Sequence, residues 1–237
     1  MKDPENEPHS TLHTSHSKLE EESQKLVTQE KPNGPVLVVG LGNPGMEYVW
    51  TPHNAGFMAI DRIAQQERVA VQNRRCKALT GTARIANREV ILAKPETFMN
   101  LSGLSVAALL KEFDIGPEER ATRLVVLYDE LDLPLGTVKI KERGSPAGHN
   151  GARSITGALG SHEWLRIRIG VGQDLPPAAI AAGAMRRGGK DYLLDPMGKK
   201  DLAVLDEVLD RVAIAVRMIV DLGPAAAMNE FNRRDKD

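Results

Sequence analysis

Three histidines lie outside the first 33 residues of this 237-residue chain, and two of them share one kind of setting. His53 and His149 each stand in a His-Asn dipeptide among small residues that permit close approach by another molecule. Each dipeptide also precedes a predicted helix, so capping of that helix is the simpler interpretation of either one alone. Two such dipeptides together favour a chemical site. The third histidine, His162, lies beside Glu163 and Trp164 and is interpreted as a surface residue.

An acidic segment supplies the carboxylate that such a site needs. The run 128–132 holds three acidic residues and follows four apolar residues typical of a buried strand. Asp129 is expected at the carboxyl end of that strand, where it could hold one imidazole N–H and stabilise the imidazolium. Glu130 and Asp132 are expected in a solvated turn. A metal site formed with His53 and His149 is the less favoured alternative, because no ligand pair has a metal-binding spacing.

A glycine-rich loop brings a further polar side chain to this region. Residues 40–45, Gly-Leu-Gly-Asn-Pro-Gly, satisfy the dinucleotide pattern G-x-G-x-x-G directly after a strand. Pro44 removes a backbone N–H beside the position of a pyrophosphate, and no acidic residue ends a second strand about 20 positions on. Nucleotide binding is therefore disfavoured. The loop instead places Asn43 at the carboxyl end of the first strand, where open α/β sheets bind ligands.

A serine or cysteine nucleophile is also disfavoured. Residues 103–107 come within one residue of the G-x-S-x-G elbow, but a polar loop precedes Ser105 where the elbow requires a strand. The single cysteine, Cys76, has basic neighbours that could lower its pKa, and we interpret it as a solvated bystander. It also leaves no partner for a disulfide or a cysteine-based zinc site.

The elements that must position these residues alternate between strand and helix. Apolar runs predict strands at 36–39, 124–127, 137–141 and 165–171, and residues 78–86 and 89–94 are predicted to form a hairpin across Asn87-Arg88. Apolar residues at helical spacing predict helices at 55–67, 102–113, 151–160, 199–222 and 224–231. This order is typical of an α/β fold, here a single three-layer domain in which helices flank a twisted mixed sheet.

Composition indicates what surrounds this domain. Residues 1–33 are polar and lack aromatic residues, so we expect a disordered tail, with the domain spanning residues 34–237. No apolar stretch approaches the roughly 20 residues of a membrane span, and no apolar segment follows Met1, so a cytoplasmic location is expected. The net charge of −1 excludes the strongly basic balance of a passive nucleic-acid binder. Any RNA contact must come from local basic clusters.

Five motifs in this chain resemble, in the same order, the bacterial-type peptidyl-tRNA hydrolase family. They are residues 38–48, 51–56, 94–103, 129–136 and 148–151, and the similarity spans about residues 35–232. The resemblance implies a monomeric α/β enzyme, without cofactor or metal, that hydrolyses the ester between peptide and tRNA and recycles prematurely released peptidyl-tRNA. It implies His53 as the catalytic residue and Asp129 as its partner. The other site residues that it implies are Asn43, Asn100 and Asn150, with Met99 and Tyr48 shaping the cleft and His149 near the bound tRNA or peptide.

The chemistry of these groups suggests a mechanism. An imidazole with a pKa near neutrality suits the deprotonation of a water by His53. The three asparagine amides would bind the peptide backbone and donate to the developing oxyanion. An alternative in which Asn150 positions the water stays open.

Two basic clusters could bind tRNA phosphates. They are Lys139, Lys141 and Arg143, which alternate along a predicted strand and would share one face, and Arg186, Arg187 and Lys190, which lie beside two glycines. Arg166 and Arg168 alternate likewise, but could merely flank the sheet. Recognition through phosphates predicts an affinity that falls steeply with salt.

Two departures from the family pattern concern loops. Residues 145–147, Ser-Pro-Ala, replace the glycine-rich run that relatives often carry, which could stiffen that loop. The segment 173–189 is longer and richer in alanine than in many relatives, so tRNA contacts transfer poorly there. An RNA-binding scaffold that has lost hydrolysis is the alternative from another class. The presence of His53, Asp129 and all three asparagines argues for a working enzyme.

Overall fold

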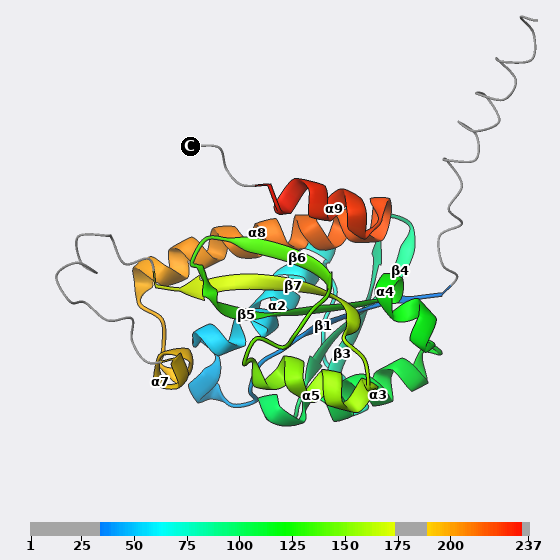
Figure 1. Cartoon of the computed structure of the whole chain (residues 1–237), viewed down its shortest axis with the longest axis horizontal. Helices are drawn as coiled ribbons and strands as arrows, with labels where there is room; N and C mark the ends of the chain where they lie inside the picture. Colours follow the sequence, from blue (N-terminus) through cyan, green and yellow to red (C-terminus); the bar gives the residue numbers. More distant parts are fainter. Residues whose placement is uncertain (1–33, 174–188, 234–237) are drawn as a thin grey trace, which may run out of the picture. The chain divides into compact units, whose positions relative to one another are not determined.

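The two fully apolar runs of the sequence become neighbouring parallel strands at the centre of a seven-stranded sheet. They are β1 (Val36–Gly40), in which every residue is buried, and β5 (Leu124–Pro134). The computed structural model describes residues 34–173 and 189–233 (Figure 1). Its strand order is β2-β3-β4-β1-β5-β7-β6. The expected tail, residues 1–33, lies outside the described residues.

The sheet is mixed, as the sequence predicts. β4 (Arg88–Pro95) and β7 (Glu163–Gly172) extend the parallel centre on either side of β1 and β5. The outer strands run antiparallel to their neighbours; they are β2 (Asn73–Arg75), β3 (Ala78–Ile85) and β6 (Val138–Arg143). The β3–β4 turn lies one residue earlier than predicted, at Ala86-Asn87, because both residues adopt the left-handed conformation (φ 48° and 62°) that two-residue hairpin turns need.

Helices cover both faces of the sheet, which confirms the three layers. α2 (Ala55–Glu67), α8 (Lys199–Leu222) and α9 (Pro224–Phe231) pack on the face to which Val36 and Val38 point. α3 (Ser102–Glu112) and α5 (Asn150–Leu159) pack on the opposite face with Leu37 and Val39 (Figure 1). Alternation along a strand thus divides one apolar run between two cores.

Several short elements were not predicted. They are the strand β2, the helices α4 (Arg120–Arg123) and α7 (Gly189–Leu194), and the 3-10 turns at Met46–Tyr48, Pro52–Asn54, Met99–Leu101 and Pro117–Glu119. Most are only three or four residues long, too short for a hydrophobic period to reveal. Among the described helices, none is long and apolar enough to span a membrane.

The glycine-rich loop after β1 owes its composition to close packing. A Cβ on Gly40 would lie 2.1 Å from the carbonyl oxygen of Gly56, and one on Gly56 would lie 2.4 Å from the carbonyl oxygen of Leu127. The first turn of α2 therefore sits directly on β1 and β5. No helix of the nucleotide-binding kind follows the loop, because a 3-10 turn occupies Met46–Tyr48.

The outer edge of β6 is covered by the end of α9. The N–H of Ile140 donates to Asn232 Oδ1 at 2.9 Å, and Asn232 Nδ2 donates to the carbonyl of Ile140 at 2.8 Å. One side-chain amide thus satisfies both backbone groups of an edge-strand residue.

Candidate active site

Asp129 lies within β5 and not at its end. The strand continues to Pro134, and Asp129 pairs in register with Ile169 of β7. The prediction that Glu130 sits in a solvated turn is wrong: Glu130 is buried and accepts a hydrogen bond from Arg168 Nε at 2.7 Å. That ion pair offsets the cost of burying the Glu130 carboxylate. The apolar pattern of the sequence could not predict a buried charge at this position. Asp132 is exposed as expected, although it still belongs to β5.

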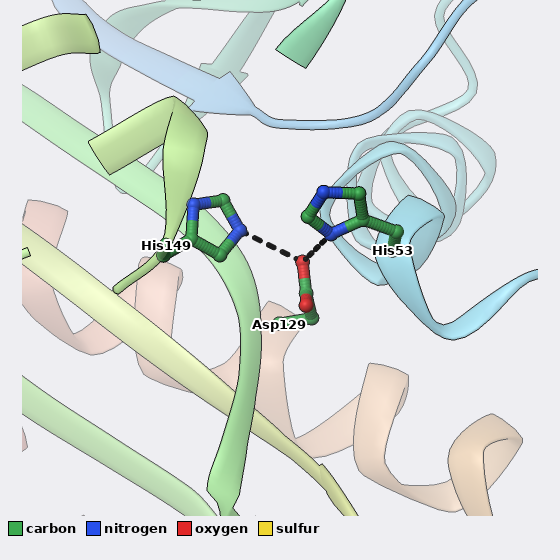
Figure 2. A group of neighbouring side chains, drawn as sticks. All are labelled: His53, Asp129 and His149. Carbon is green, nitrogen blue, oxygen red and sulfur yellow. Dashed lines mark hydrogen bonds and ion pairs between the residues drawn. The ribbon is translucent and has the colours of Figure 1, made fainter. Parts of the chain in front are cut away.

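Asp129 receives two imidazoles on one carboxylate oxygen. His53 Nδ1 and His149 Nε2 each lie 2.9 Å from Asp129 Oδ1 (Figure 2). His53 comes from the 3-10 turn that precedes α2, and His149 is the N-cap residue of α5. The two rings approach to 5.1 Å between centroids. The structure therefore joins the two His-Asn dipeptides, 96 positions apart in the chain, at a single buried carboxylate.

The start of α5 fixes the tautomer of His149. The N–H of Ala152 donates to His149 Nδ1 at 3.1 Å, so Nδ1 carries no proton and Nε2–H donates to Asp129. The capping posed as the alternative for this residue is therefore confirmed, and the capping ring also contacts Asp129. His53 donates from Nδ1, and its Nε2 points away from Asp129, as an acceptor that no described residue occupies (Figure 2).

Charge and burial act in opposite directions on this cluster. Burial disfavours the charged forms of both partners, but the Asp129 carboxylate outweighs it and raises the pKa of His53 above its usual value. The two imidazoles likewise hold the pKa of Asp129 well below its usual range. Asp129 Oδ2 is buried without a hydrogen-bond partner among the described residues. Asp129 is therefore ionised at neutral pH and holds the two rings through one oxygen.

A cavity of about 710 Å³ opens over these residues. The predicted site residues that line it are Asn43, His53, Met99, Asn100, Asp129, His149 and Asn150. Phe98, Leu131 and Leu193 supply apolar wall. Tyr48 is half-buried in its 3-10 turn and does not line this cavity.

The side chain of Asn43 is oriented by backbone contacts. Its Oδ1 accepts from the N–H of Met99 at 2.9 Å, which leaves the amide nitrogen as a donor for the cavity. Asn54 holds the backbone of Asn43 on both sides, at 2.8 Å to its N–H and 3.0 Å to its carbonyl. Sequence reasoning assigned no role to Asn54, although its place in the first His-Asn dipeptide was the available signal.

The second dipeptide has a comparable arrangement. Asn150 Oδ1 accepts from Arg153 Nη2 at 3.2 Å, so the Asn150 amide nitrogen is again left as the donor. Arg153 was not predicted, and its position three residues further along α5 was the signal that could have found it. Asn100 is exposed on the rim. The cavity is thus lined by amide donors and by one imidazole acceptor.

The candidate tRNA contacts are partly described. Lys141 and Arg143 are exposed on β6, while Lys139 Nζ donates to the carbonyl of Asn232 at 3.3 Å. The register shifts between Lys141 and Arg143, so the simple alternation predicted for the strand is interrupted there. Lys190 belongs to α7, and Arg186 and Arg187 lie outside the described residues.

Arg166 is buried and Arg168 is half-buried. Arg166 is 1% exposed and stacks 3.6 Å from the Trp164 ring centroid. Its Nη1 donates to the carbonyls of Gly144 at 2.9 Å and Ser145 at 3.4 Å, which anchors the loop that leads to His149. With Arg168 bound to Glu130, neither arginine is placed to meet a phosphate.

The other nucleophile candidates are unsuited to catalysis. Ser105 is fully buried in α3. Cys76 is half-buried, and burial together with Glu112 raises its pKa against the opposing effect of Arg75. The basic neighbours do not lower this pKa, because burial and a carboxylate outweigh them, and Cys76 is less solvated than expected of a bystander thiol.

The ligand atoms of His53, Asp129 and His149 lie within 4.8 Å of one another, close enough to consider a metal. A metal on His149 Nε2 would move the ring proton to Nδ1, where it would face the N–H of Ala152. The cluster fits a hydrogen-bonded triad better than a metal centre.

Comparison with known proteins agrees with this architecture. The model of the family described as peptidyl-tRNA hydrolase matches residues 37–237. The peptidyl-tRNA hydrolase of Acidobacterium capsulatum is 57% identical over 201 residues, which cover 85% of this chain and 97% of that protein. That of Koribacter versatilis is 50% identical over 198 residues, covering 84% and 92%.

A crystal structure of peptidyl-tRNA hydrolase from Acinetobacter baumannii gives a TM-score of 0.70 at 31% identity, covering 83% of this chain and 94% of that one. Fold and relatives together define a hydrolytic enzyme built on a mixed α/β sheet. The chain belongs to the peptidyl-tRNA hydrolase family.

Proposed function

We propose that this chain hydrolyses the ester between the peptide and the tRNA of peptidyl-tRNA, with His53 as general base, and so recycles tRNA from prematurely released peptidyl-tRNA. Family membership supports the reaction. The observation that carries the assignment of residues is the 2.9 Å contact between His53 Nδ1 and Asp129 Oδ1 at a cavity lined by amide donors.

The proton path follows from the tautomers. With Nδ1–H directed at Asp129, His53 Nε2 accepts a proton from a water as that water attacks the ester carbonyl. Asp129 stabilises the imidazolium that forms, and the imidazolium returns its proton to the departing ribose oxygen. An ester is hydrolysed more readily than an amide, so a covalent intermediate on a serine or cysteine is unnecessary.

The amide nitrogens of Asn43 and Asn150 are the donors for the developing oxyanion or for the peptide backbone. Their oxygens are already bound, by the N–H of Met99 and by Arg153, so each nitrogen faces the substrate without rearrangement. One such donor lowers the barrier by about 3 kcal/mol.

The tRNA is proposed to bind through its phosphates. Exposed Lys141 and Arg143 on β6 support this, and Lys139, Arg186, Arg187 and Lys190 are the other candidates. Substrate affinity that is insensitive to salt would contradict it. The enzyme is proposed to act as a monomer in the cytoplasm, without metal or cofactor.

The test is release of N-acetylated amino acid from N-acetyl-aminoacyl-tRNA in the presence of EDTA. Wild type is expected to be active, and His53→Ala to lose roughly 10²–10⁴ in rate. His162→Ala, which removes an exposed histidine, is the matched control and should keep the wild-type rate. Near-normal hydrolysis by His53→Ala would rule out the base assignment, and loss of wild-type hydrolysis in EDTA would rule out the metal-free mechanism.

A further inference from the structure

A second cavity, of about 550 Å³, adjoins the first on the far side of Asn43, which lines both. It lies between the loop that follows β1, the start of α2, the adjoining ends of β3 and β4, and α8. Its volume is in the range of ligand pockets. The mechanism proposed above, which takes place at His53, makes no use of it.

The rim of this second cavity exposes large apolar side chains. Met46 is 86% exposed and Trp50 is 58% exposed, both in the segment between β1 and α2. Phe57 and Met58, half-buried in the first turns of α2, continue the apolar lining. Phe98, 59% exposed on the wall of the first cavity, belongs to the same end of the molecule as the shared residue Asn43. Apolar surface grouped in this way is typical of a binding surface.

The charges around the second cavity are paired. Lys94 Nζ lies 2.5 Å from Asp61 Oδ1, and Arg62 binds Asp210 at 2.5 Å. Arg62 also binds Asp206, and Glu96 is bound by Arg74 at 3.1 Å. Each cation lining the cavity therefore already has a carboxylate partner. Such a surface suits a neutral, partly apolar chain and not a polyanion such as tRNA.

We propose that the second cavity binds the part of the peptide that lies N-terminal to the residue esterified to tRNA. This inference rests on the proposed function, which puts the ester carbonyl at His53. An extended peptide advances about 3.3–3.6 Å per residue, so successive residues pass from the first cavity across Asn43 into the second. Met46 and Trp50 then contact peptide side chains, and apolar sequences bind best.

The test compares two substrates that share one ester bond. One tRNA carries N-acetyl-alanine, and the same tRNA carries an N-acetylated pentapeptide of leucine and alanine that ends in that alanine. Trp50→Ala and Met46→Ala are expected to lower the preference for the pentapeptide, measured as the ratio of the two kcat/KM values, about five- to tenfold. Leu222→Ala, at an apolar residue 63% exposed that lines neither cavity, is the matched control and should keep the ratio.

The outcomes separate this inference from the proposed function. A preference that survives both substitutions, while both substrates are hydrolysed, overturns the peptide site and leaves the hydrolase assignment intact. Equal losses on both substrates that shrink at high salt would indicate tRNA in this cavity and also overturn it. A wild-type chain that hydrolyses neither substrate overturns the proposed function and the peptide site with it.

Trp50 offers a readout that is independent of hydrolysis. The chain has two tryptophans, and Trp164 is 0% exposed, so solvent-sensitive emission comes from Trp50. Titration with the free N-acetylated pentapeptide should shift that emission to shorter wavelength, and Met46→Ala should weaken the apparent affinity. Emission that stays constant while the peptide inhibits hydrolysis would contradict the proposal.

Discussion

His149 donates to Asp129 through the one ring nitrogen that the start of α5 leaves free. The helix uses Nδ1 as its cap, and the carboxylate uses Nε2, so the ring is held at both ends. Because the same Asp129 oxygen also receives His53, the capped end of α5 helps to position the residue proposed as the general base. His149 is on this basis a positioning residue.

The two contacts of His149 can be separated by substitution. Asparagine is a good N-cap residue but is too short to reach Asp129, so His149→Asn should keep the cap of α5 and lower kcat about tenfold. His149→Ala should lower kcat similarly and also lower the free energy of unfolding by about 1 kcal/mol. Denaturant titration and steady-state kinetics would measure both effects. Unchanged kcat in His149→Asn would show that the contact with Asp129 has no catalytic importance.

The pH dependence of kcat/KM should report the raised pKa of His53. A general base must be unprotonated, so activity falls as the pH drops through that pKa, which lies above about 6.5 because Asp129 outweighs burial. Asp129→Asn removes the charge, leaves the burial, and should move this acid limb to lower pH while lowering the rate roughly 10²–10⁴.

Exposed Asp132, in the same strand, provides the control, and Asp132→Asn should leave the limb in place. The raised pKa of His53 also makes the stability of the fold depend on pH. The contact of protonated His53 with Asp129 contributes fully to the free energy of unfolding below the pKa of the unfolded state, about 6.5. This contribution is lost as the pH rises through the pKa of His53 in the folded state. A limb in Asp129→Asn that moves upward would contradict the electrostatic account.

Asn43→Asp tests the amide donor at nearly constant shape. The carboxylate still accepts from the N–H of Met99, so folding should be little affected, but the donor facing the cavity is replaced by an acceptor. We expect kcat to fall roughly 10²–10³. Asn73→Asp, on the exposed edge strand β2, makes the same chemical change away from the site and should have no kinetic effect. Wild-type kcat in Asn43→Asp would assign the oxyanion donor elsewhere.

Arg166→Gln tests the anchoring of the loop before His149. Loss of buried charged hydrogen bonds to backbone carbonyls should destabilise the fold by about 2–3 kcal/mol and speed amide hydrogen exchange across residues 144–150. Arg211 also donates to a backbone carbonyl, that of Gly136, but is exposed, so Arg211→Gln should cost less than about 1 kcal/mol. Equal costs for the two variants would show that burial of Arg166 is unimportant.

Much of the fold could be predicted because long elements carry a clear hydrophobic period. α8 and α9 begin and end at the predicted residues, separated by Gly223. β5 was predicted too short, since its charged second half, from Asp129 on, breaks the apolar run. Asp129 and Glu130 are tolerated inside the sheet because residues distant in sequence, His53 and Arg168, bind their carboxylates.

The candidate site could be predicted in its residue types but not in its contacts. Two His-Asn dipeptides indicated a site, yet nothing local showed that both imidazoles share one oxygen of Asp129. The supporting residues Asn54 and Arg153 act through individual side-chain hydrogen bonds, which leave no period in the sequence. Arg166 resembled a surface cation because its alternation with Arg168 is also the pattern of a solvent-facing strand.

The amide of Asn232 occupies the place on β6 that a peptide group of another strand would take. A strand from a second copy of the chain could pair with β6 at Ile140 only if the end of α9 were first displaced. α9 thereby prevents the β6 edges of two copies from pairing. A truncation that removes α9 should leave a protein that aggregates more readily.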